Sequence, residues 1–101
     1  MASALGNGTY EDIGTRQNPP VVRCHLAIIR ESDGSFSVIV LNLPGAGGCG
    51  DTEDEAILDT REAVTGLVKE YRRDGVAIPW SDASDYTIPE GAKSKWILVN
   101  V

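Results

Sequence analysis

The sequence predicts an α+β domain in which one main helix packs on an antiparallel sheet, in the order β-β-β-α-β. Three observations lead to this fold class. Apolar residues alternate with a period of two over residues 21–30 and 36–41, they recur at helical spacing over residues 52–75, and the C-terminus is apolar and β-branched. With 101 residues, the chain has the length of one domain with one hydrophobic core.

Residues 1–20 are predicted to form a flexible N-terminal arm. They are rich in Gly, Asn and Thr, poor in aliphatic residues, and end on Pro19-Pro20. The arm lacks the basic start and apolar stretch of a secretory signal, and no apolar segment of the chain is long enough to span a membrane. We therefore expect a cytoplasmic protein without membrane contact, folded over residues 21–101, with Cys24 and Cys49 as free thiols.

The first two elements are predicted to be strands that form a hairpin. In VVRCHLAIIR, residues 21–30, every second side chain faces the core: Val22, Cys24, Leu26 and Ile28. Asp33-Gly34 suits a turn because glycine tolerates positive φ, and the alternation resumes from Phe36 to Leu41. Leu43-Pro44-Gly45 then ends the second strand, since proline cannot donate to a ladder. Only a weak pattern indicates a short third strand from Ala46 to Cys49.

The helix is predicted to begin after Thr52 and to end at Gly75. Thr52 is a typical N-cap, Glu55 three positions on completes a capping box, and a glycine is a common C-terminal stop. The apolar stripe expected to face the sheet consists of Ala56, Thr60, Ala63, Val64, Leu67, Val68 and Tyr71.

The last element is predicted to be a strand in residues 95–101. Ile97, Val99 and Val101 alternate with Trp96 and Leu98, so both faces are expected to be covered, either inside the sheet or across a dimer interface. The candidate residues for a homo-oligomer interface, dimeric or larger, are Trp80, Trp96 and Leu98.

The glycine-rich stretch before the helix does not have the pattern of a chemical site. A phosphate-binding P-loop needs Lys and Ser or Thr after its glycines, whereas Gly50 is followed by Asp51-Thr52. His25 is the only histidine, and it points to the opposite face of its strand from Cys24. We therefore predict no catalytic residue, no metal site and no cofactor, and we interpret the glycines as a tight strand-to-helix corner.

The formal net charge of -6 works against binding a polyanion and favours a basic partner. Several carboxylates lie at the start of the predicted helix. There they interact favourably with the positive end of the helix dipole, and they also offer a negative surface to a basic partner. The candidate partner-binding residues, here called the acidic lip, are Asp51, Glu53, Asp54, Glu55, Asp59 and Glu62.

One ordered series of residue types runs through residues 22 to 80. Its motif residues are Asp33, Gly34, Leu43, Pro44, Gly45, Gly50, Asp51, Thr52, Glu55 and Ala56. The series continues after the helix start with Glu62-Ala63, Gly75 and Ile78-Pro79. In this series, residues 22 to 80 resemble the HicB family, the antitoxins of HicA-HicB toxin-antitoxin pairs.

The resemblance implies a partial ribonuclease-H-like domain that covers the active site of a basic, mRNA-cleaving HicA-type toxin. In that family a DNA-binding segment usually follows the domain. The predicted domain, residues 21–101, reaches Val101, so no such segment and no direct nucleic-acid binding are expected for this chain. Asn42 stands where the family usually has Asp, Ala46-Gly47 replaces larger residues, and the N-terminal arm has no counterpart. Two alternatives stay open: a homo-oligomeric interaction module without a toxin, and a divalent-metal nuclease.

Overall fold

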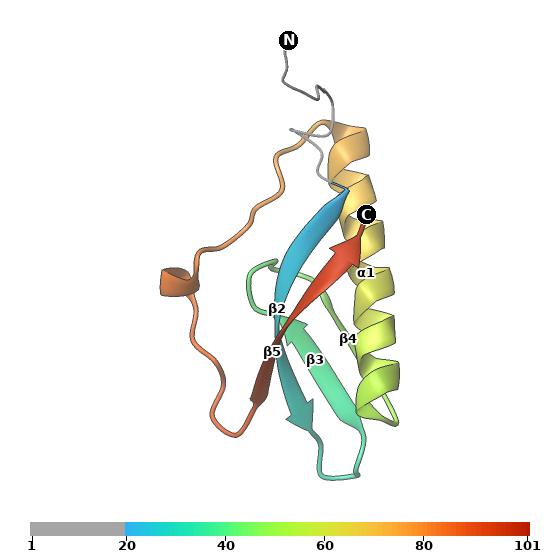
Figure 1. Cartoon of the computed structure of the whole chain (residues 1–101), viewed down its shortest axis with the longest axis vertical. Coiled ribbons are helices and arrows are strands. Elements are labelled where there is room, and N and C mark those ends of the chain that lie inside the picture. The colour runs from blue at the N-terminus through green and yellow to red at the C-terminus, as the bar shows by residue number, and fades with distance from the viewer. Residues whose placement is uncertain (1–19) are drawn as a thin grey trace.

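The computed structural model describes residues 20–101 (Figure 1). The predicted arm, residues 1–20, lies outside the described residues apart from Pro20. The described elements are β2 (Val21–Arg30), β3 (Phe36–Val40), β4 (Gly47–Gly50), α1 (Glu53–Asp74), the short 3-10 helix η2 (Ala83–Asp85) and β5 (Lys93–Asn100).

The four strands form one antiparallel sheet in the order β4-β3-β2-β5, which confirms the predicted fold class. The hairpin pairs Leu26 with Val40, and β5 returns along the other side of β2, where Ile97 pairs with Cys24. Helix α1 lies along one side of the twisted sheet, and the segment between α1 and β5 loops out on the other side (Figure 1). We call the sheet face away from α1 the outer face.

The hydrophobic core lies between α1 and the sheet, on the predicted face of β2. Its fully buried side chains include Leu26, Leu43, Val40, Val64, Val68, Val99 and Cys24. The helix stripe is confirmed at Ala56, Thr60, Val64 and Val68. Ile57, absent from the predicted stripe, is also buried. The buried face of the helix is wider than the predicted stripe and includes this neighbour of Ala56.

Both predicted turns form by the expected backbone chemistry. Gly34 has φ 89°, and Asp33 accepts hydrogen bonds from the Ser35 hydroxyl and backbone N–H at 2.6 and 2.9 Å. In the Leu43-Pro44-Gly45 turn, glycine has φ 91° directly after proline, and the N–H of Ala46 donates to the Leu43 carbonyl at 3.2 Å. Proline followed by a positive-φ glycine is the type II arrangement, so this corner follows from local sequence.

The third strand is Gly47–Gly50, and it packs directly on α1. A Cβ atom on Gly48 would lie 2.6 Å from the Thr60 hydroxyl oxygen, and one on Gly50 would lie 2.6 Å from the backbone nitrogen of Ala56. The strand therefore consists mainly of glycine because the helix backbone leaves no room for side chains. The same composition explains why its sequence pattern was weak.

The caps of α1 confirm both predicted ends. The Thr52 hydroxyl accepts the N–H of Glu55 at 3.1 Å, while the Glu55 carboxylate accepts the N–H of Asp51, one residue before the N-cap, at 3.1 Å. At the other end, Gly75 has φ 68°, and Val76 donates its N–H to the Tyr71 carbonyl at 3.0 Å. This is the Schellman arrangement that satisfies the last carbonyls of a helix.

Asn42 continues the β2–β3 ladder beyond the end of β3. Its side-chain oxygen accepts the N–H of His25 at 2.9 Å, and its side-chain nitrogen donates to the Arg23 carbonyl at 3.0 Å. Its own carbonyl accepts the N–H of Ser81 at 3.0 Å. The side-chain amide of the buried Asn42 therefore pairs with the backbone of β2, and its backbone carbonyl holds the loop after α1.

β5 is an edge strand, which corrects one of the two predictions made for it. Coverage inside the sheet is wrong, because the topology leaves β5 with a single neighbour, β2. Ile97 and Val99 are buried under α1, whereas Trp96 and Leu98 lie on the outer face with 47% and 61% of their surfaces exposed. Coverage of that face across a dimer interface stays a prediction.

Candidate functional site

Three of the six carboxylates in the acidic lip have partners within the chain. Glu53 forms an ion pair with Lys93 at 3.0 Å, Asp59 accepts the backbone N–H of Cys49 at 3.0 Å, and Glu55 belongs to the helix cap. Each of these contacts holds α1 against a neighbouring segment, so these three acids have a structural role in addition to any role in binding.

The carboxylates of the other three acids, Asp51, Asp54 and Glu62, form no hydrogen bond or ion pair with any residue from Pro20 to Val101, and the three residues are exposed. Asp54 and Glu62 lie four residues before and after Leu58, so the three side chains follow one line on the helix surface. Between these two acids, the apolar side chain of Leu58 is 58% exposed to solvent. We call Asp54, Leu58 and Glu62 the exposed stripe.

Sequence reasoning listed the acids but missed Leu58. Its position two residues from both Ala56 and Thr60 places it on the opposite side of the helix from the core, and a full helical projection gives that signal. An exposed apolar side chain with carboxylates one turn away on both sides suits contact with a protein that presents an apolar pocket and basic residues.

The outer face of the sheet carries a second cluster, around Trp96. The indole stacks on the His25 ring with centroids 4.2 Å apart and planes 7° apart, and the Arg23 guanidinium lies 4.8 Å from the indole centroid. The hydroxyl of Tyr86, from the loop after α1, lies 2.7 Å from Nδ1 of His25. His25, considered from sequence for a catalytic or metal role, therefore joins the loop to the sheet.

Two of the three predicted interface residues share this outer face, and all three are exposed. Trp96 and Leu98 occupy alternate positions of β5, and Trp80, 39% exposed, lies in the loop after α1. An interface requires such exposure, and the oligomeric state stays a prediction.

The motif residues that carry the family resemblance have structural positions. Leu43 is fully buried, Pro44 and Gly45 form the type II turn, and Gly50 allows the close approach of β4 to α1. Ala56 is buried directly beneath Gly50. The motif thus specifies the strand-to-helix corner from which the acidic lip begins, rather than a reactive centre.

The two free thiols differ in accessibility. Burial raises the pKa of Cys24 to about 11, partly opposed by the nearby Arg61 cation, whereas Cys49 is exposed on β4. We expect a thiol-specific disulfide reagent at pH 8 to label Cys49 rapidly in the folded chain and Cys24 only in urea, because the thiolate is the reactive form. Stopped-flow absorbance measures both phases, and two rapid phases without urea would contradict the packing of Cys24.

Between Pro20 and Val101, no group of three or more His, Cys, Asp or Glu side chains is placed to hold a metal ion. Over the same residues, no helix has both the length and the apolar character needed to cross a bilayer. The carboxylates of the acidic lip spread along the start of α1, whereas two-metal nuclease chemistry uses carboxylates that converge on two ions.

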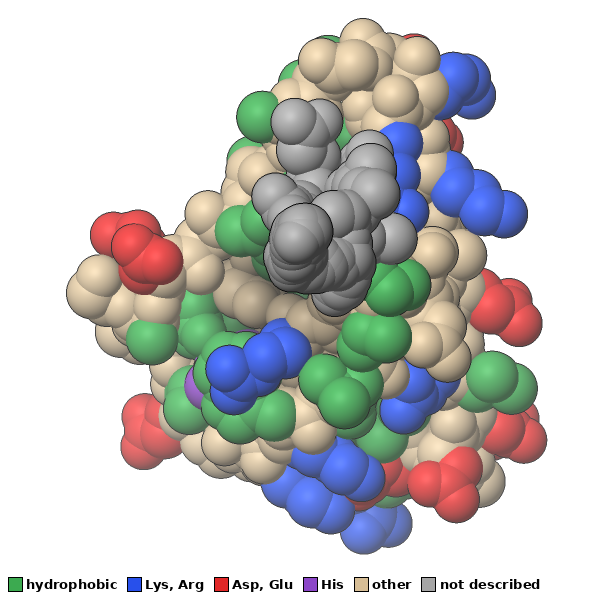
Figure 2. Space-filling view, turned by 45° about the horizontal axis from the view of Figure 1, so that its top comes forward, with side chains coloured by type: hydrophobic (Ala, Val, Ile, Leu, Met, Phe, Trp, Pro, Cys, Tyr) green, Lys and Arg blue, Asp and Glu red, His purple; other side chains and the backbone are tan. Residues whose placement is uncertain are grey.

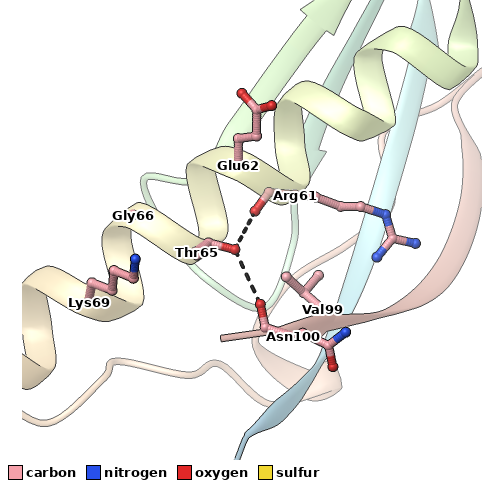
Figure 3. Close-up of a pocket in the computed structure, with 7 residues that line it drawn as sticks. All are labelled: Arg61, Glu62, Thr65, Gly66, Lys69, Val99 and Asn100. Atoms are coloured by element: carbon pink, nitrogen blue, oxygen red, sulfur yellow. Dashed lines mark hydrogen bonds between the residues drawn. The ribbon is translucent and has the colours of Figure 1, made fainter.

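An open groove of ≈ 450 Å³ lies between α1 and the C-terminal half of β5 (Figure 3). Its lining residues are Arg61, Glu62, Thr65, Gly66, Lys69, Val99 and Asn100. Arg61 donates to the Leu98 carbonyl at 2.6 Å. The Thr65 hydroxyl, which has one proton to donate, lies 2.9 Å from the Arg61 carbonyl and 3.4 Å from the Asn100 carbonyl. Glu62 joins this groove to the exposed stripe.

Comparison with known proteins places this architecture among antitoxin domains. No protein-family model and no curated protein matches the chain. Among solved structures, it is similar to the N-terminal domain of the Burkholderia pseudomallei antitoxin HicB, with 30% identity, a TM-score of 0.57, and coverage of 79% of this chain and 98% of that domain.

It is also similar to the Burkholderia pseudomallei antitoxin HicB itself, with 30% identity, a TM-score of 0.59 and coverage of 79% of this chain. The match spans 63% of that longer protein. The 30% identity and the near-complete coverage of the N-terminal domain lead to one conclusion: the chain belongs to the HicB antitoxin family.

Proposed function

We propose that this protein is an antitoxin that binds a basic, mRNA-cleaving HicA-type toxin in the cytoplasm and blocks its active site without catalysis. The observation that carries the proposal is the 30% identity to an antitoxin domain over 79% of the chain. Blocking by coverage needs only a complementary surface, and the described residues offer one on α1.

The contact with the toxin is centred on the exposed stripe. Leu58 supplies an apolar side chain for a pocket, while Asp54 and Glu62 supply unpaired carboxylates on either side of it. Charges at the rim speed the encounter with a basic protein, and the buried apolar contact slows dissociation. Glu53, Glu55 and Asp59 hold α1 in place and add to the negative potential of the acidic lip.

The direct test mixes the purified chain with the product of the gene that neighbours its own. Size-exclusion chromatography with light scattering measures the complex, and cleavage of a fluorescent RNA measures toxin activity. We expect a stable complex and loss of RNA cleavage at equimolar protein. A complex that leaves cleavage intact, or no complex at all, would refute the antitoxin role.

Charge-reversal variants distinguish the local effect of the acidic lip on association from the effect of the chain's net charge. We expect the double variant Asp51→Lys/Asp54→Lys to associate with the toxin about tenfold more slowly at low salt, because electrostatic steering is lost. The control Asp82→Lys/Asp85→Lys makes the same change of charge in the loop after α1. Surface plasmon resonance gives both association rates, and equal slowing in the two variants would contradict a local role for the lip.

A second candidate function is a homo-oligomeric interaction module without a toxin. The exposure of Trp80, Trp96 and Leu98 favours it, because large apolar side chains on one surface are typical of interfaces. Light scattering of the chain alone distinguishes the two: an oligomer that binds no toxin supports the module, and the complex described above supports the antitoxin.

A further inference from the structure

The outer edge of β5 has backbone groups without partners. The Leu98 carbonyl points to Arg61 and away from β2, and backbone groups of alternate residues in an antiparallel strand point to the same edge. Ser94 and Trp96 therefore direct their N–H and C=O groups to the same open edge, where no residue of the described chain pairs with them. Such an edge is a template for another strand.

The side chains beside this edge are apolar on one face and cationic on the other. Trp96 and Leu98 extend over the outer face, and Trp96 is held by its stacking on His25. Lys95 is exposed on the α1 face, and Lys69 lines the groove; neither forms an ion pair with another described residue. In Figure 2, hydrophobic and basic side chains share the middle of the view, and most acidic side chains lie toward its margins.

A second copy of the chain fits this edge poorly. Symmetric antiparallel pairing centred on Ser94 would place Lys95 opposite Lys93 of the other copy, and pairing centred on Lys95 would place two lysines opposite each other. Pairing centred on Trp96 avoids this clash but needs the Leu98 carbonyl, which Arg61 already occupies. Like charges and an occupied acceptor both disfavour self-pairing.

We propose that the edge of β5 binds an extended segment of another protein in which acidic and apolar residues alternate, as an added antiparallel strand. Its apolar side chains would lie on the outer face beside Trp96 and Leu98, and its acidic side chains on the opposite face beside Lys95. This binding is independent of the toxin contact proposed above, which uses α1.

The groove between α1 and β5 continues this site. Arg61 occupies the Leu98 carbonyl, and beyond it the groove opens beside Val99 with Lys69 on its helix wall. Gly66 lies on the same wall, with open space where its Cβ would be. A glycine inside an exposed helix costs about 1 kcal/mol relative to alanine, so its presence suits close approach of a bound chain better than it suits the helix alone.

The test uses the full chain and a synthetic peptide, acetyl-Thr-Glu-Val-Asp-Val-Glu-Thr-amide. Hydrogen exchange measured by NMR distinguishes strand addition from other binding. We expect the peptide to protect the Ser94 and Trp96 amides, which face the open edge, while the amides of Lys95 and Ile97 are already protected by β2. A peptide with Lys in place of Glu and Asp is expected not to bind.

Three variants sharpen the test. Lys95→Glu is expected to bind the acidic peptide about tenfold more weakly, whereas Arg73→Glu, which makes the same charge change at the end of α1, is expected to bind it unchanged. Ser94→Pro removes one edge N–H, a change that an edge strand tolerates, and is expected to abolish the added protection of the Trp96 amide.

Three results would overturn the proposal. The first is equal binding of the lysine peptide or equal weakening by Lys95→Glu and Arg73→Glu. The second is displacement of the acidic peptide by a thymidine oligonucleotide, with no protection of the Ser94 amide, which would indicate a surface for polyanions. The third is protection of the Trp96 amide that grows with protein concentration without peptide, which would indicate self-pairing.

Discussion

Replacing Gly50 with alanine is expected to lower the free energy of unfolding by about 3 kcal/mol, because overpacking at a rigid contact is relieved only by moving backbone. The added Cβ would lie 2.6 Å from the Ala56 nitrogen and 2.7 Å from the Glu55 Cβ, both in the first turns of α1. Neither the helix start nor β4 is free to withdraw without breaking the cap or the ladder to β3. Urea unfolding followed by tryptophan fluorescence measures the loss.

Gly66→Ala is the matched control for this substitution. Its added Cβ meets no atom within 4 Å, and alanine is the better helix former, so stability is expected to rise by up to about 1 kcal/mol. Both variants replace a glycine with alanine, one in β4 where it packs on α1 and one in the interior of α1. Equal effects would show that β4 does not pack on α1 as described.

Asn42→Leu is expected to cost about 3 kcal/mol, because it removes the buried amide that pairs with the backbone of β2. The His25 N–H and the Arg23 carbonyl would both lose their partners, and each unsatisfied buried group costs about 1–3 kcal/mol. The hydrogen bond from the Ser81 N–H is expected to remain, because it goes to the backbone carbonyl of residue 42. Thermal and urea unfolding of the variant measure the loss, and unchanged stability would mean that water satisfies these groups.

Asn42→Asp separates the two hydrogen bonds. A carboxylate still accepts the N–H of His25 but cannot donate to the Arg23 carbonyl, so an intermediate loss of stability is expected. Aspartate is the residue type usual here in the family that the sequence resembles. A cost equal to that of leucine would show that the acceptor contributes nothing to the fold.

Much of the fold was predictable because its signals are local. The β2–β3 hairpin follows from two-residue alternation around Asp33-Gly34, and both ends of α1 follow from Thr52 and Gly75. Caps and turns involve residues within a few positions of each other, so residue type and spacing are sufficient to specify them.

Features that depend on distant contacts were missed or left open. Gly47–Gly50 is a strand only because α1 and β3 lie on either side of it. Asn42 is important for hydrogen bonds to residues 17 and 19 positions away. The position of β5 at the edge, which leaves Trp96 and Leu98 exposed, depends on which side of β2 the last strand returns to.

The candidate site divides in the same way. Residue identity alone determined that this chain carries a dense set of carboxylates at a helix start, and the ordered motif already indicated its family. The tertiary structure decided which of those carboxylates are free: Glu53 and Asp59 are engaged by groups from elsewhere in the chain, while Asp54 and Glu62 stay unpaired beside Leu58. The physical reason is the separation in sequence between the residues that interact. Alternation, caps and turns involve residues within a few positions of each other, whereas burial, pairing and exposure depend on segments brought together only in the folded chain.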